Sequence, residues 1–185
     1  MKDFSLFRQA LKVAPKPRED LGTVSSLSRR EFNEHDNFLI RAQSPCLEYA
    51  CLMVENALLM RTRRSGRIYA GFEHLSWMQP VVDRYLRIAD ISETVYVFGE
   101  NDWQPPRHPN IRYISLQPGL TINRESFLVA DCGNYHAALV AVDEGGFEAV
   151  GARHRNFTIF KSSNPTVVNQ LAGVLEGMID WSFTV

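Results

Sequence analysis

Two apolar runs joined by only two residues constrain the fold of this chain more than any other feature of its sequence. The runs are SFLVADC, residues 126–132, and YHAALVAV, residues 135–142, and they flank the pair Gly133-Asn134. A two-residue connection that begins with glycine is typical of a type II′ turn between antiparallel strands. The sequence therefore predicts a β-hairpin here.

Further helices and strands are predicted on both sides of the hairpin from apolar spacing, capping signals and turn residues. Glu31 lies three residues after Ser28, which is the spacing of a capping box. Helices are expected over residues 4–12, from Ser26 or Ser28 to about Arg41, from Ser44-Pro45 to the Ser65-Gly66 stop, over 80–90 and from Asn164-Pro165 onward. Strands are expected over residues 67–72, 94–99, 111–116 and 155–160, and loops over 15–20 and 101–110.

This order of elements favours an α+β (mixed α/β) fold. We expect a mostly antiparallel central sheet of about five to six strands, with N-terminal helices, one βα unit and a C-terminal helix packed on it. The chain has 185 residues, of which 45% are hydrophobic, and this suits a single domain over residues 1–185. Its core is expected over about residues 5–160, with the C-terminal helix over about 164–180.

Charge and cysteine content exclude several classes of function. The formal net charge is −1, with 20 basic and 21 acidic residues, so no overall field attracts nucleic acid or an anionic membrane. No apolar stretch approaches the roughly 20 residues of a membrane span. The three cysteines form no CxxC pair and the five histidines show no metal-ligand spacing, so neither a disulfide framework nor a metal site is indicated. We expect a cytoplasmic protein without membrane insertion.

The stretch YAGFEHLSWMQPVVDRYLRIA, residues 69–89, carries the first candidate site. It places Glu73 and His74 at the end of a strand, where a carboxylate and an imidazole can bind a polar ligand or exchange protons. The structural alternative is that Glu73 and Ser76 cap the next helix while His74 packs at the edge. Aromatic residues nearby could line a pocket for a flat ligand or form ordinary core and rim: Tyr69, Phe72, Trp77 and Trp103.

Two further features have a functional and a structural interpretation. Four arginines in seven residues could hold an acidic protein partner, although cations are favoured at a helix C-terminus in any case; they are Arg61, Arg63, Arg64 and Arg67. Cys132 and His136 lie across the hairpin turn, and a buried thiol is the simpler interpretation of Cys132. No phosphate-binding glycine loop, nucleophile elbow or haem, flavin or bilin motif is present, so no cofactor is indicated.

Several segments, taken in order, resemble the DICT sensory domain, a family named for its occurrence with diguanylate cyclases and two-component systems. The resemblance covers roughly residues 5–160 and is carried by SLFRQALK, SLSRREFNEHDN, YAGFEHLSWMQPVVDRYLRIADISETVYVFGE and ESFLVADCGNYHAALVAVDE. It implies a non-enzymatic sensory domain of bacteria, often photosynthetic ones, that works upstream of signalling enzymes. No catalytic or ligand residue can be transferred from the family to this chain.

The resemblance also implies a partner. No GGDEF, EAL or kinase segment accompanies the domain, so a standalone protein is expected to act on a histidine kinase, a response regulator or a cyclic-di-GMP enzyme. Modulation by a small ligand, by light or by redox state is left open by the sequence. The alternatives are a homodimeric adaptor without a ligand, built on the apolar face of residues 47–58, and a small-molecule enzyme that uses Glu73, His74 or Cys132.

Overall fold

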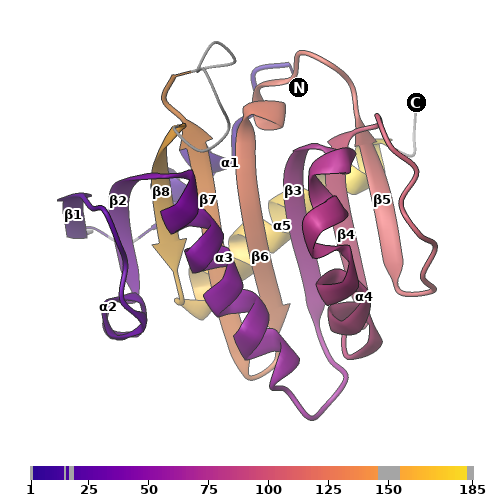
Figure 1. Cartoon of the computed structure of the whole chain (residues 1–185), viewed down its shortest axis with the longest axis horizontal. Coiled ribbons are helices and arrows are strands. Elements are labelled where there is room, and N and C mark those ends of the chain that lie inside the picture. Colours follow the sequence, from indigo (N-terminus) through magenta and orange to yellow (C-terminus); the bar gives the residue numbers. More distant parts are fainter. Residues whose placement is uncertain (1, 15, 17–18, 146–154, 183–185) are drawn as a thin grey trace.

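The predicted hairpin lies at the centre of an eight-stranded sheet (Figure 1). It consists of β6 (Glu125–Cys132) and β7 (Tyr135–Asp143), which pair in antiparallel register from Glu125–Val142 to Cys132–Tyr135. A computed structural model describes residues 2–14, 16, 19–145 and 155–182. Gly133 does not adopt the positive φ that a type II′ turn requires at its first central residue, so the hairpin is confirmed but the predicted turn type is wrong.

The strand order is β1-β2-β8-β7-β6-β3-β4-β5. The other six strands are β1 (Glu19–Thr23), β2 (Asn37–Gln43), β3 (Arg67–His74), β4 (Thr94–Glu100), β5 (Ile111–Leu116) and β8 (Asn156–Ser162). Four of the seven neighbouring pairs are antiparallel, and the pairs β1–β2, β3–β4 and β4–β5 are parallel. The expected α+β fold with a mostly antiparallel sheet is confirmed, and the sheet is larger than predicted.

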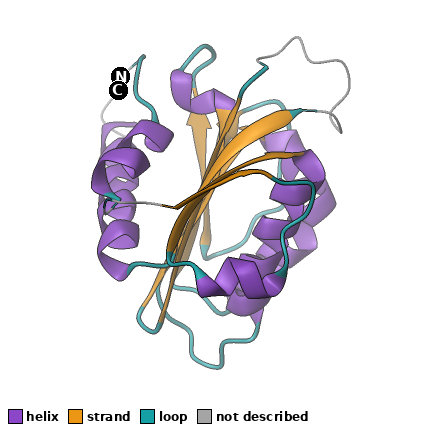
Figure 2. Cartoon of the chain, turned by 90° about the vertical axis from the view of Figure 1, so that its left-hand side faces the viewer, coloured by secondary structure: helices purple, strands orange, loops and turns teal. Residues whose placement is uncertain are grey.

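Helices cover both faces of the sheet, and Figure 2 shows the sheet between these two layers. On one face lie α3 (Ser44–Leu59) and α4 (Val82–Asp90), the latter preceded by the short 3₁₀ helix η1 (Leu75–Val81). On the other face lie α1 (Leu6–Val13) and the C-terminal helix α5 (Pro165–Ser182). Two short elements complete the fold, α2 (Arg29–Glu34) and the 3₁₀ helix η2 (Thr121–Arg124).

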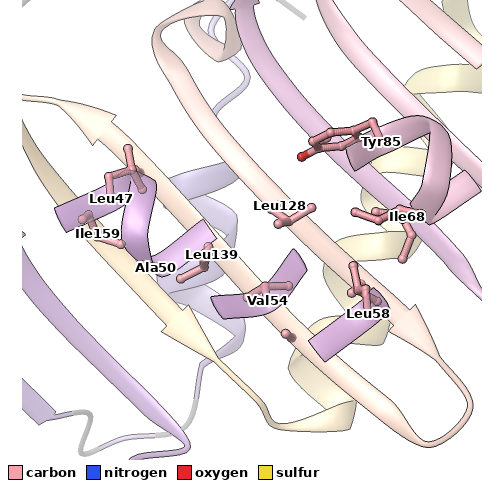
Figure 3. Close-up of a cluster of buried hydrophobic side chains, with 14 of the residues drawn as sticks. Leu47, Ala50, Val54, Leu58, Ile68, Tyr85, Leu128, Leu139 and Ile159 are labelled. Atoms are coloured by element: carbon pink, nitrogen blue, oxygen red, sulfur yellow. The ribbon is translucent and has the colours of Figure 1, made fainter. Parts of the chain in front are cut away.

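Each face of the sheet carries its own buried core because side chains alternate between the two faces along every strand. The core under α3 and α4 joins Leu47, Val54 and Leu58 of α3 to the sheet residues Leu128 and Leu139 (Figure 3). The core under α1 and α5 contains Phe98, Phe160 and Leu171. The alternation along each strand therefore decides which of its side chains lie under α3 and α4 and which lie under α1 and α5.

Helix ends follow the expected capping chemistry at several positions. Ser28 accepts a hydrogen bond from the backbone of Glu31 and the Glu31 carboxylate accepts one from the backbone of Ser28, so the predicted capping box is confirmed. Asn164 accepts from Thr166 and Val167 and so caps α5. Helix α3 begins one residue earlier than predicted, with Ser44 inside the helix rather than at the N-cap.

The predicted helix from Ser26 or Ser28 to about Arg41 is wrong in its second half. The capped helix ends at Glu34, and residues 37–43 form β2 instead. Phe38, Ile40 and Ala42 alternate with less buried neighbours, and antiparallel pairing with β8 satisfies the backbone of this segment. Strand β1, which includes the end of the predicted loop 15–20, adds to β2 in parallel.

Candidate functional site

Most strands of the sheet end at the same edge, and several charged side chains lie at these strand ends. Strands β1, β2, β3, β4, β5 and β7 all run in one direction, and β6 and β8 run in the other. Glu73 and His74 therefore end β3 at the same edge where Glu100 ends β4, Asp143 ends β7 and Arg155 precedes β8. The carboxyl ends of parallel strands are where open α/β sheets place their ligand sites.

Arg155 joins two of these carboxylates in a buried cluster. Its Nε donates a hydrogen bond to Asp143 Oδ2 at 2.7 Å, and both terminal nitrogens lie 3.0 Å from Glu73 Oε2. Burial lowers the pKa of Arg155, but the hydrogen bonds and charges of Asp143 and Glu73 outweigh this and raise it. The guanidinium also lies 5.1 Å from the ring centre of Trp77, within cation–π range. We call Glu73, Asp143 and Arg155 the Arg155 cluster.

His74 points to a different group from its neighbour Glu73. Its ring contacts the indole of Trp77 at a centroid distance of 5.7 Å. Its Nδ1 lies 3.9 Å from Glu100 Oε2 and 4.0 Å from Asp102 Oδ2, which is too long for direct hydrogen bonds. This nitrogen is buried and has no hydrogen-bond partner among the described residues.

The alternative interpretation of Glu73 and Ser76 as helix caps is not what the structure contains. The 3₁₀ helix η1 has no side-chain cap, and Glu73 instead binds Arg155. The Ser76 hydroxyl donates to Asp102 Oδ2 at 2.5 Å, and the Ser76 backbone N–H donates to Oδ1 at 2.9 Å. The Ser76 hydroxyl thereby lowers the pKa of Asp102 and fixes the start of the loop after β4 to η1.

A pocket of about 460 Å³ that is open to solvent lies beside this edge, between η1, strand β5 and the loop after β4. In Figure 1 this loop runs back along β5 before that strand begins. The Tyr113 hydroxyl donates to the Pro106 carbonyl at 3.0 Å and holds the loop against the strand. The residues that line the cavity are Leu75, Asn101, Trp103, Gln104, Pro105, Arg107, Tyr113 and Ser115. We call it the Trp103 pocket.

The six predicted ligand-binding residues lie in four different places. Glu73, His74 and Trp77 come together at the edge, with about half of Trp77 exposed, and Trp103 lines the adjacent pocket. Phe72 packs edge-on against Tyr85 under α4, in the first core.

Tyr69 lies on the opposite face of the sheet. It is stacked on Tyr96, and its hydroxyl donates to Glu176 of α5 at 2.8 Å. A ligand role for any of the six residues stays a prediction.

Three of the four arginines predicted to bind a partner make contacts within the chain. Arg61 donates to Cys132 Sγ at 2.8 Å, Arg64 donates to the carbonyl of Ser92 at 3.0 Å, and Arg67 pairs with Glu176. Arg63 is exposed and makes no hydrogen bond or ion pair with the described residues. A partner role for this cluster also stays a prediction, and Arg63 has the freest side chain for it.

The enzyme alternative required Glu73 and His74 to act together or Cys132 to be reactive. Glu73 is bound in the Arg155 cluster, and Cys132 lies at the opposite edge of the sheet, beside the hairpin turn. Burial raises the pKa of Cys132 to about 11, which keeps the thiol protonated at neutral pH. In the described part of the chain, no group of three or more His, Cys, Asp or Glu side chains is placed to hold a metal ion.

Sequence reasoning missed Asp143, Arg155, Arg107 and Tyr113 as site residues. A signal for Asp143 exists in the strand pattern, because it continues the inward series Ala137, Leu139 and Ala141. A carboxylate on the buried face of a strand requires a cationic partner. Arg155 supplies the charge, but it is far from Glu73 in sequence and only the sheet topology brings them together.

Comparison with known proteins identifies a family and a related fold. Residues 26–144, more than half of the chain, match the sequence profile of the DICT family, described as a sensory domain in diguanylate cyclases and two-component systems. Among curated proteins, no sequence matches this chain.

Solved structures include two similar ones. A polyphosphate kinase from Porphyromonas gingivalis is 16% identical, with a TM-score of 0.52 over 96% of this chain and 29% of the kinase. This chain thus spans less than a third of that protein, and the likeness shows the fold alone. A phospholipase D family member, Nuc from Salmonella typhimurium, is 15% identical, with a TM-score of 0.38 over 76% of this chain and 93% of Nuc.

Proposed function

The chain belongs to the DICT family of sensory domains, and we propose that it binds a small molecule in the Trp103 pocket and reports its presence to a signalling protein. The observation that carries this proposal is the pocket itself. Its volume of about 460 Å³ lies within the range of roughly 300–1,000 Å³ typical of small-molecule sites. It also lies beside the carboxyl ends of parallel strands, where ligands bind in related sheet architectures.

The position of the pocket supports a sensory role. Leu75 belongs both to the pocket wall and to η1, the element that carries Trp77 and precedes α4. The Ser76–Asp102 hydrogen bonds tie the pocket loop to the same element. A ligand that moves the loop therefore acts directly on η1, and through Trp77 on the Arg155 cluster.

The signalling partner in this proposal is a histidine kinase, a response regulator or a cyclic-di-GMP enzyme in the cytoplasm. We expect it to contact the end of α3, where Met60 is 75% exposed and the exposed Arg63 follows. The unpaired guanidinium of Arg63 suits contact with an acidic protein surface. No helix within the described part of the chain is long and apolar enough to cross a membrane.

The test is isolation of the tagged protein from its own host under gentle conditions. Small molecules released by denaturation are identified by mass spectrometry, and co-purifying proteins are identified in the same sample. The affinity of a recovered partner is then measured with loaded and with ligand-stripped protein. A change in affinity supports the proposal, whereas equal affinities with and without ligand contradict the link between pocket and partner. The double variant Met60→Ser/Arg63→Ser is expected to lose the partner and keep the ligand.

A further inference from the structure

We infer that the molecule held in the Trp103 pocket is a planar aromatic monocarboxylate. This inference rests on the proposed function, because it assigns a chemical class to the ligand of the same pocket. It follows from the charge of the lining residues, from the shape of the walls and from the hydrogen-bonding groups between them.

The charge of the pocket selects an anion. Among the described residues that line it, Arg107 is the only charged one. Its guanidinium makes no hydrogen bond or ion pair with the described residues, so its donors are available to a ligand. The two carboxylates in the preceding segment have other partners, since Glu100 accepts from Asn123 at 2.7 Å and Asp102 accepts from Ser76.

The number of charges limits the ligand to one negative group. One guanidinium can neutralise one carboxylate through paired N–H donors. A di- or triphosphate would leave further negative charge uncompensated near Glu100 and Asp102, and like charges at such a site repel. A cation finds no acidic residue among the lining side chains.

The walls of the pocket select a flat apolar body. Trp103 and Tyr113 supply aromatic surfaces, and Leu75 and Pro105 supply aliphatic ones. Trp103 also packs against the core under α3 and α4, and the Tyr113–Pro106 hydrogen bond fixes the second ring. Rings held in this way can stack on a planar ligand without losing much side-chain freedom.

Neutral polar groups can complete recognition of the carboxylate. Asn101, Gln104 and Ser115 line the same cavity and can donate amide or hydroxyl hydrogen bonds. Burial raises the pKa of Tyr113, so its hydroxyl stays neutral and adds no negative charge to the pocket. The pocket therefore combines one cation, neutral donors and aromatic walls.

The inference is tested by isothermal titration calorimetry with three probes that share one naphthalene ring, namely 2-naphthoate, 2-naphthamide and 2-naphthylmethylammonium. We expect 2-naphthoate to bind up to about tenfold more tightly than the amide, because Arg107 is exposed and solvent weakens a charge-assisted hydrogen bond to it. The ammonium compound is expected not to bind. Acetate, which has the charge but no aromatic body, is also expected not to bind.

Two variants and a matched control test whether the preference for naphthoate arises in the Trp103 pocket. Arg107→Gln is expected to remove the preference for naphthoate while it changes amide binding by less than about twofold. Trp103→Leu is expected to weaken both. The control Arg29→Gln removes the same charge from α2, at the other end of the sheet, and is expected to leave all affinities unchanged.

Two results would overturn the inference. One is equal affinity of the wild-type protein for naphthoate and naphthamide, and the other is retention of the preference in Arg107→Gln. If the probes fail while protein purified from its host carries a small molecule that Trp103→Leu loses, the ligand class is wrong and the proposed sensory function stands. If the host protein carries no small molecule but naphthoate binds as expected, the pocket chemistry is right and the sensory proposal fails.

Discussion

Replacing Arg155 by methionine should cost far more stability than replacing an exposed arginine in an ion pair. The side chains of Arg155, Glu73 and Asp143 are 13%, 7% and 1% exposed, so the substitution leaves two buried carboxylates facing each other without a cation. Removal of one partner from a buried ion pair typically costs about 3–5 kcal/mol, and we expect Arg155→Met to fall in this range.

Urea denaturation at neutral pH, followed by circular dichroism, measures this loss. The matched control is Arg41→Met, because Arg41 pairs with Asp20 at 3.3 Å on the surface and such pairs contribute less than about 1 kcal/mol. A second arm removes the leftover charges with Glu73→Gln and Asp143→Asn in the Arg155→Met background. We expect this triple variant to recover about 2 kcal/mol, since the cost comes from unpaired charge rather than from lost volume.

Either of two results would show that Arg155 does not stabilise the fold by neutralising Glu73 and Asp143. The first is an Arg155→Met variant no less stable than Arg41→Met. The second is a triple variant that is less stable than the single one, which would mean that the remaining carboxylates stabilise the fold by other contacts. Either result would mean that the Arg155 cluster does not hold the ends of β3 and β7 and the side chain of Trp77 in place.

Three further predictions concern other parts of the fold. Burial lowers the pKa of Lys161 from 10.5 to about 8, so its protonated form destabilises the native state at neutral pH and this cost disappears as pH rises from 8 to 10.5. Wild-type stability minus that of Lys161→Met should therefore rise by about 2 kcal/mol between pH 8 and 10, measured by urea denaturation, and a flat difference would contradict this. Gly66→Ala should lower the free energy of unfolding by about 2–4 kcal/mol, because φ is +80° and the new Cβ would meet the backbone of β6 at 2.5 Å. Gly119 has the same φ but open space around it, so Gly119→Ala should lower the free energy of unfolding by only about 1–2 kcal/mol. The Glu125 carboxylate caps α1 by accepting from the backbone N–H groups of its first two residues at 2.8 and 3.1 Å, so Glu125→Gln should weaken this cap. Amide hydrogen exchange in α1 should then become about tenfold faster, while exchange in β6 should not change.

Most of the fold could be predicted from the sequence because its signals are local. The hairpin, the strands near residues 94–99 and 111–116 and the helix from Ser44-Pro45 each depend on side-chain periodicity and on turn or capping residues within the segment. Strand β2 was missed because its conformation depends on a partner more than a hundred residues away, β8. Local patterns carry no information about such pairing.

The candidate site could be predicted only in part, for the same reason. Glu73, His74 and Trp77 were found because they share one strand end, and Trp103 was found because it follows another. Tyr69 and Phe72 lie close together in sequence, but their side chains point to opposite faces of β3 and enter different cores. They therefore cannot line one pocket together. Arg155 and Arg107 were missed because only the sheet topology and the path of the loop along β5 bring them to the edge.

The central claim is that this sensory domain holds a small molecule in the Trp103 pocket. Native mass spectrometry of protein purified gently from its own host tests it most directly, with wild type, Trp103→Leu and the control Trp77→Leu side by side. Trp77 is a suitable control because it is exposed and lies on Arg155 rather than in the pocket wall. We predict an additional mass on wild type and Trp77→Leu that is absent from Trp103→Leu. The bare chain mass in wild type, or an additional mass retained by Trp103→Leu, would contradict the claim.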